Sequence, residues 1–186
     1  MRSRSNSALF WPILLVILVV DVVTKAIAER ALLPRGIPHD VFGDWLRFTL
    51  VYNPGAAFGL NLGPQSRWIF SALTIVALVV LARLYLTTRP GDTARVSALA
   101  LVCAGAIGNL IDRLRSFFGV VDFIDIGIGD SRWPTFNVAD MAVSIGAGLL
   151  AYVLWQEDRL AQGVAPVVAP VAVPASASGG EPGDLV

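Results

Sequence analysis

The sequence predicts an all-α integral membrane protein with four transmembrane helices and a small extracytoplasmic sheet in the first outer loop. Of its 186 residues, 55% are apolar and only 15% are charged, and the mean hydropathy is +0.68. This balance favours a membrane protein over a soluble domain of the same length. Four apolar segments each approach the roughly 20 residues that a bilayer crossing requires. Between the first two segments lies a stretch in which apolar and polar residues alternate, as is typical of a strand.

The expected spans cover residues 8–28, 68–86, 96–112 and 138–155. The third and fourth segments approach spanning length only with their polar ends included, so we expect these ends near the membrane interface. A cleaved secretory signal is the alternative for the first segment. That segment contains Asp21 and Lys25 and lacks a small-x-small cleavage site, so we expect it to be retained.

Basic residues outside the spans indicate the orientation. Arg2 and Arg4 precede the first segment, and Arg89 and Arg95 lie in the short loop between the second and third segments. The positive-inside rule therefore favours cytoplasmic termini, although the first loop also carries four arginines. On this interpretation the polar loops, at about residues 29–67 and 113–136, face outward.

The first outer loop contains the stretch WLRFTLVYN at residues 45–53, in which apolar and polar residues alternate with the period of a half-buried strand. The stretch NPGAAFG at residues 53–59 then introduces a Pro-Gly turn. Residues 161–186 are rich in Pro, Ala, Val and Ser and show no periodicity. We expect one folded domain over residues 1–160, followed by a disordered cytoplasmic tail.

Composition excludes several classes of function. The net charge is zero, which argues against a nucleic-acid partner. One cysteine and one histidine exclude a disulfide framework and make a His/Cys metal site improbable, and we expect no cofactor. Any catalysis would depend on carboxylates, hydroxyls or Lys25, which is the single lysine.

Polar side chains near the apolar segments are expected to gather at the outer interface, and such residues are candidates for a functional site in a membrane protein. They are Asp21, Lys25, Asn53, Asn109, Asp112, Arg113, Asp122, Asn137 and Asp140.

Most of these residues could also have a purely structural role, as members of an ion pair or as a helix cap. Asp21 and Lys25 are spaced i,i+4 and form a possible neutralising pair, and the adjacent Asp112 and Arg113 form a possible interfacial pair. In TFNVADMAV, at residues 135–143, an asparagine is placed to cap a helix, with an acid at its third position favoured by the dipole. Asp122 lies between apolar residues, where the pKa of an acid tends to rise.

Two carboxylates that meet at one site can divide their titration, so that one is protonated while the other is ionised, as in aspartic proteases. Three other functions are possible from these residues. A transporter or proton-conducting protein also uses intramembrane acids. A Ser–Lys enzyme would use Lys25, and a structural scaffold would leave the pair of Asp122 and Asp140 without a role.

Five sequence blocks carry a resemblance to a known family. In order they are DVVTK at 21–25, NPGAAFG at 53–59, GNLIDR at 108–113, VVDFID at 120–125 and FNVAD at 136–140. Over about residues 8–157 the chain resembles the lipoprotein signal peptidases (signal peptidase II) of bacteria. The resemblance implies a four-helix aspartyl endopeptidase of the bacterial inner membrane, with a small extracytoplasmic β-cradle. Its implied partners are membrane lipids and prolipoproteins, which it would cleave before a diacylglyceryl-modified cysteine.

The resemblance also implies roles for individual residues. The family's catalytic pair falls on Asp122 and Asp140, at the extracytoplasmic interface. Asn53, Arg113 and Asn137 are expected to contact substrate or orient the pair. The remaining supporting positions are Gly55, Asn109, Asp112, Asp21 and Lys25. If Lys25 only balances Asp21, its replacement by alanine should have a mild effect.

Overall fold

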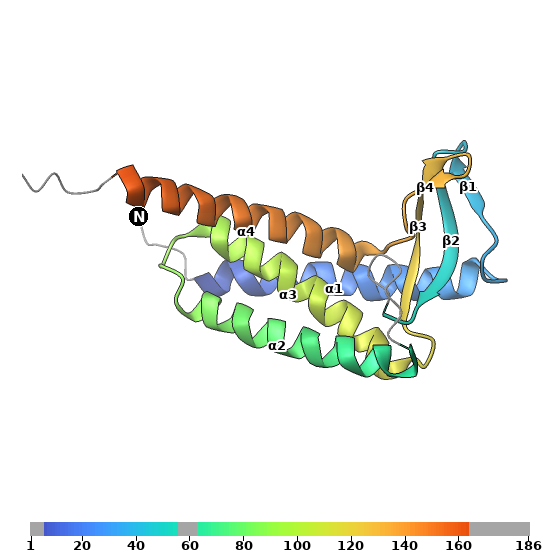
Figure 1. Ribbon diagram of the computed structural model, residues 1–186, viewed down its shortest axis with the longest axis horizontal. Coiled ribbons are helices and arrows are strands. Elements are labelled where there is room, and N and C mark those ends of the chain that lie inside the picture. The colour runs from blue at the N-terminus through green and yellow to red at the C-terminus, as the bar shows by residue number, and fades with distance from the viewer. Residues whose placement is uncertain (1–5, 56–62, 164–186) are drawn as a thin grey trace, which may run out of the picture.

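The computed structural model describes residues 6–55 and 63–163. Within these residues four helices are long and apolar enough to cross a membrane. They are α1 (Asn6–Ala31), α2 (Ser66–Leu86), α3 (Thr93–Arg115) and α4 (Val138–Gly163). The helices run along one another, and a small sheet lies at one end of the bundle (Figure 1). Each helix covers one of the predicted spans.

Helix α4 extends beyond residue 160, where we expected the folded domain to end, and reaches Gly163. The rest of the predicted tail, residues 164–186, lies outside the described residues, as do residues 56–59 of the NPGAAFG block.

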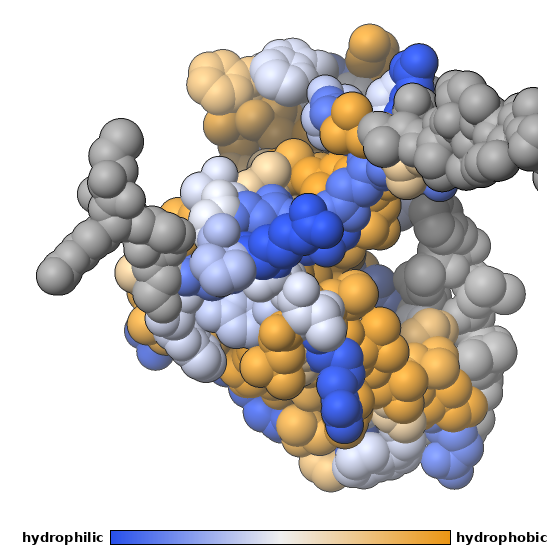
Figure 2. Space-filling view, turned by 90° about the vertical axis from the view of Figure 1, so that its left-hand side faces the viewer, coloured by the Kyte–Doolittle hydropathy of each residue, from blue (hydrophilic) through white to orange (hydrophobic). Residues whose placement is uncertain are grey.

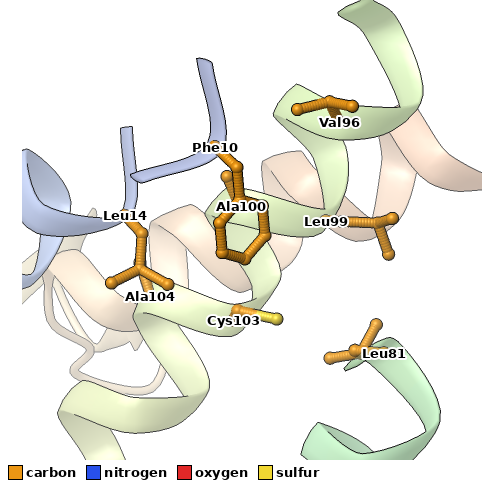
Figure 3. Packing of buried hydrophobic residues seen from close by; sticks show 8 residues of the cluster. All are labelled: Phe10, Leu14, Leu81, Val96, Leu99, Ala100, Cys103 and Ala104. Carbon is orange, nitrogen blue, oxygen red and sulfur yellow. The ribbon is translucent and has the colours of Figure 1, made fainter. Parts of the chain in front are cut away.

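Helix α3 lies at the centre of the bundle and is the most buried of the four spans. Figure 3 shows Phe10 and Leu14 of α1 and Leu81 of α2 packed around the α3 cluster that includes Cys103. Cys103 is buried, as expected for a small apolar residue. Helices α3 and α4 approach closely, because a Cβ on Gly105 would lie 2.3 Å from the backbone oxygen of Ala139.

The outward faces of the helices are apolar. On α1, Val16 and Val19 are 60% and 58% exposed, and on α2 Leu73 and Val76 are 57% and 61% exposed. A soluble protein rarely exposes so many large aliphatic side chains on adjacent helices. In a bilayer these side chains contact lipid, which agrees with four membrane spans.

The sheet has four antiparallel strands in the order β1-β2-β3-β4. Strands β1 (His39–Phe42) and β2 (Leu46–Asn53) follow α1, whereas β3 (Val120–Ile128) and β4 (Ser131–Arg132) follow α3. The sheet is therefore not confined to the first loop, and an all-α description omits it. The first residues of β3, Val120–Phe123, are all buried, so they lack the alternation that identifies a half-buried strand.

A second apolar cluster attaches the sheet to the end of α1. Ala28 and Leu32 pack against Leu50 of β2 and against Val121 and Phe123 of β3. Both long connections, which carry the strands, lie at this end of the bundle (Figure 1). The start of α1, the end of α4 and the short α2–α3 connection lie at the opposite end. Figure 2 looks onto that opposite end, where hydrophilic side chains gather among apolar ones.

Candidate active site

The N-terminus of α4 is closed by a reciprocal cap. The Asp140 N–H donates to the Asn137 side-chain oxygen at 2.9 Å, and the Asn137 N–H donates to the Asp140 carboxylate at 3.2 Å. Asp21 of α1 accepts from the Ala139 N–H at 2.9 Å. These bonds satisfy backbone donors that a helix start leaves unpaired, and they fix the position of Asp140. The cap expected from the sequence is present.

Asn137 also holds the second carboxylate. Its side-chain nitrogen donates to Asp122 Oδ1 at 2.6 Å and to the Val121 carbonyl at 3.2 Å. Asp122 comes from β3 and is 2% exposed, whereas Asp140 is half-buried. One asparagine thus contacts both carboxylates, although they lie on different elements.

Burial, together with the nearby charge of Asp140, raises the pKa of Asp122 from 3.8 to about 7. Hydrogen bonds from Asn53 and Asn137 act in the opposite direction. Desolvation disfavours the ionised form of a carboxylic acid, and a second carboxylate nearby does the same. Asp122 is therefore largely protonated below neutral pH.

Asn109 of α3 connects Asp140 to the buried charges. Its side-chain nitrogen donates to Asp140 Oδ1 at 2.7 Å. Its side-chain oxygen accepts from Lys25 Nζ at 2.9 Å and from the Asn137 side chain at 3.1 Å. The amide is thereby held in one orientation, with its donor group directed at Asp140.

Lys25 is 1% exposed and does more than neutralise Asp21. Its ammonium lies 2.8 Å from Asp21 and 2.9 Å from Asp112, and it also donates to Asn109. These three acceptors match the three protons of an ammonium group. Lys25 thus contacts two carboxylates and an amide, which argues against a Ser–Lys enzyme.

Asp112 and Arg113 do not form the interfacial pair considered from the sequence. Asp112 pairs with Lys25 and, at 3.4 Å, with Arg115. Neighbouring residues on a helix point about 100° apart, so Arg113 faces elsewhere. Its guanidinium is attracted by both Asp140 and Asp122. Among the described residues, the buried Arg113 Nε has no hydrogen-bond partner.

The turn after β2 positions Asn53. The Gly55 N–H donates to the Asn53 side-chain oxygen at 3.0 Å, which is an Asx turn, and the Asn53 side chain also hydrogen-bonds Asp122. Gly55 has a φ of 119°, and a Cβ there would lie 2.5 Å from the ring of Phe70. Glycine is therefore required in this turn.

A cleft of about 270 Å³ opens beside these residues. Its polar lining includes Asn53, Arg113 and Asp140. An adjoining hollow of about 360 Å³ continues along α4, where Met141 and Ile145 make it apolar. Four residues line both parts: Trp133, Phe136, Asp140 and Ser144. The cleft thus joins a polar region at the sheet to an apolar region on the outer face of α4.

The structure brings together every site residue predicted from the sequence. Eight lining residues were not predicted as site residues: Phe70, Trp133, Pro134, Thr135, Phe136, Met141, Ser144 and Ile145. Ser144 and Ile145 follow Asp140 by four and five residues, so helical periodicity places them near its face. Phe70 lies far from the other residues in the sequence, and no local pattern identifies it.

Comparison with known proteins identifies the family of the chain. The family model described as signal peptidase (SPase) II matches residues 13–156. The chain belongs to the signal peptidase II family. It is 39% identical over 148 residues to a lipoprotein signal peptidase of Halothermothrix orenii, covering 80% of this chain and 95% of the relative. It is 42% identical over 157 residues to one of Burkholderia thailandensis, covering 81% and 91% respectively.

Two solved structures of a bacterial membrane enzyme share the fold of this signal peptidase II family member. Both were determined by the in meso method, at 2.3 Å and 1.9 Å resolution. The first matches with a TM-score of 0.75 and 30% identity over 85% of this chain and 94% of its own. The second matches with a TM-score of 0.72 and 31% identity over 83% and 97%. The chain is thus a multi-pass membrane peptidase whose bundle and sheet match those of a bacterial membrane enzyme.

Proposed function

We propose that this membrane peptidase removes signal peptides from prolipoproteins, with Asp122 and Asp140 as an aspartic catalytic pair. The curated relatives are named lipoprotein signal peptidases, which supports the substrate class. One observation carries the assignment of the pair: Asn137 contacts both carboxylates, and one of them, Asp140, lines the cleft. The two acids also differ in environment, which is the condition for one to be protonated while the other is ionised.

In the proposed reaction Asp140 is the base and Asp122 the acid. Ionised Asp140, which lines the cleft, takes a proton from water as the water oxygen adds to the scissile carbonyl carbon. Protonated Asp122 donates a hydrogen bond to the carbonyl oxygen, where negative charge develops. The carbon–nitrogen bond then breaks, and the proton on Asp140 passes to the departing amine. Arg113 supplies a positive charge beside both acids.

The two parts of the cleft suit a diacylglyceryl-modified substrate. Asn53 and Arg113 at the polar part provide hydrogen-bond donors for a peptide backbone. The apolar part, beside Met141 and Ile145, lies on a membrane-spanning helix and suits the acyl chains. Cleavage just before the lipid-bearing cysteine places the scissile bond between these two regions, beside Asp140.

We further propose that the sheet end of the bundle is extracytoplasmic and that both termini are cytoplasmic. The end opposite the sheet carries Arg89 and Arg95, as the positive-inside rule expects for the cytoplasmic side. A transporter would need polar groups along the bundle. Within the described part, the core around Phe10, Leu14 and Leu99 is apolar, and the buried charges gather near the sheet.

The test compares two peptides that differ only in the diacylglyceryl group on cysteine. The purified protein in detergent micelles should cleave the lipidated peptide just before the cysteine, with products identified by mass spectrometry. The unlipidated peptide should remain intact, because only the lipidated peptide has acyl chains for the apolar part of the cleft. Equal cleavage of both peptides, or of neither, would contradict the proposed substrate class.

A further inference from the structure

Glu29 lies on the same face of α1 as the buried charges. Asp21, Lys25 and Glu29 follow one another at intervals of four residues, so they form one stripe along the helix. The Glu29 side chain is 29% exposed and lies at the end of this stripe that contacts the sheet, through Tyr52 of β2. It contacts residues of two other elements, Arg115 on α3 and Tyr52 on β2.

One series of contacts leads from Glu29 to Asp140. Arg115 donates to Glu29 Oε2 at 3.0 Å and lies 3.4 Å from Asp112. The carboxylate of Asp112 holds Lys25 at 2.9 Å. Lys25 then fixes the amide of Asn109, as described above, and that amide donates to Asp140 at 2.7 Å. Every step is an ion pair or a hydrogen bond, and the three middle groups, Asp112, Lys25 and Asn109, are buried.

A second series leads from Glu29 toward Asp122. The Tyr52 hydroxyl donates to Glu29 Oε1 at 3.1 Å. Tyr52 pairs with Val121 in the β2–β3 ladder, and the next residue, Asn53, hydrogen-bonds Asp122. Tyr52 therefore anchors to α1 the part of β2 that carries Asn53.

We propose that Glu29 is a positioning residue that aligns the two catalytic carboxylates, through Arg115 toward Asp140 and through Tyr52 toward Asp122. The proposal rests on the function proposed above. Glu29 touches neither carboxylate and acts by holding α3 and β2 against α1. Because each series begins at a different carboxylate oxygen, variants can interrupt one series and leave the other intact.

The test uses steady-state kinetics on a diacylated lipopeptide. Glu29→Gln keeps an oxygen that accepts from Tyr52 but loses the charge that holds Arg115. We expect kcat to fall about 10-fold while KM changes little, because alignment affects the reacting groups more than substrate binding. Arg115→Gln should give the same fall, and the double variant should be no worse than either single variant. Arg115→Lys, which keeps the cation, should restore part of kcat.

Tyr52→Phe interrupts only the second series and should also lower kcat without raising KM. The matched control is Glu157→Gln, which breaks another interhelical ion pair, with Arg95, far from the site. This control should retain the wild-type kcat. Wild-type kcat in both Glu29→Gln and Arg115→Gln, even with reduced thermal stability, would overturn the proposal. Failure of the wild-type protein to cleave the lipopeptide would instead refute the proposed function.

Discussion

Replacement of Asp122 by asparagine should remove a loss of stability that the wild-type protein shows as the pH rises to 7. The pKa of Asp122 is raised from 3.8 to about 7, and burial is the main cause. Between these two values the folded protein holds a proton that the unfolded chain has released, so stability falls as pH rises. A shift of about three units at 1.36 kcal/mol per unit amounts to about 4 kcal/mol, all of it lost above pH 7.

The asparagine side chain introduced by Asp122→Asn would resemble the protonated acid, with an oxygen that still accepts from Asn137. The free energy of unfolding of the wild type should fall between about pH 4 and pH 7. The free energy of unfolding of Asp122→Asn should not show this fall. The free energy of unfolding of the variant minus that of the wild type should therefore increase by up to about 4 kcal/mol from pH 4 to pH 8.

The assay is reversible unfolding in detergent micelles, followed by tryptophan fluorescence and circular dichroism at several pH values. Asp125→Asn is the matched control, because Asp125 is also buried in β3 but pairs with Arg132. This control should lose stability, because it weakens that ion pair. Parallel pH profiles for the wild type and Asp122→Asn would refute the reasoning, since Asp122 would then carry no raised pKa.

Three further outcomes follow from the structure. Lys25→Ala should destabilise the protein by about 3–5 kcal/mol in thermal unfolding, because two buried carboxylates lose their partner; an effect below about 1 kcal/mol would argue against that pairing. Gly105→Ala should separate α3 from α4 and lower both stability and activity, whereas Gly148→Ala, with open space around its Cβ, should leave both unchanged or slightly improved. Asn109→Ala should lower kcat about 100-fold in lipopeptide assays, because Asp140 loses its donor; an unchanged kcat would exclude that role.

The prediction for Lys25 differs from the one made from sequence alone. Spacing within α1 identifies Asp21 as a partner, but Asp112 and Asn109 are more than 80 residues away in the chain. A local pattern shows only contacts along one helix. We therefore expect Lys25→Ala to have a large effect and not the mild one that loss of a simple pair would have, because Asp21, Asp112 and Asn109 all contact the lysine.

The helices and the cap of α4 were predictable because their signals are local. Long apolar runs identify spans, and an asparagine three residues before an acid identifies the cap of Asn137 and Asp140. Strand β3 was not predicted, because its first residues are buried on both faces and do not alternate. The cleft is also lined by residues from three helices, strand β2 and two connections, such as Phe70 and Trp133, which only the fold brings together.

The central claim is that Asp122 and Asp140 form the catalytic pair. The most direct measurement is the cleavage rate of a diacylated lipopeptide by Asp122→Asn and Asp140→Asn, with Asp125→Asn as the control. Both site variants should remain folded in micelles and show no detectable cleavage, while the control cleaves at a rate near that of the wild type. Wild-type cleavage by either site variant would contradict the claim.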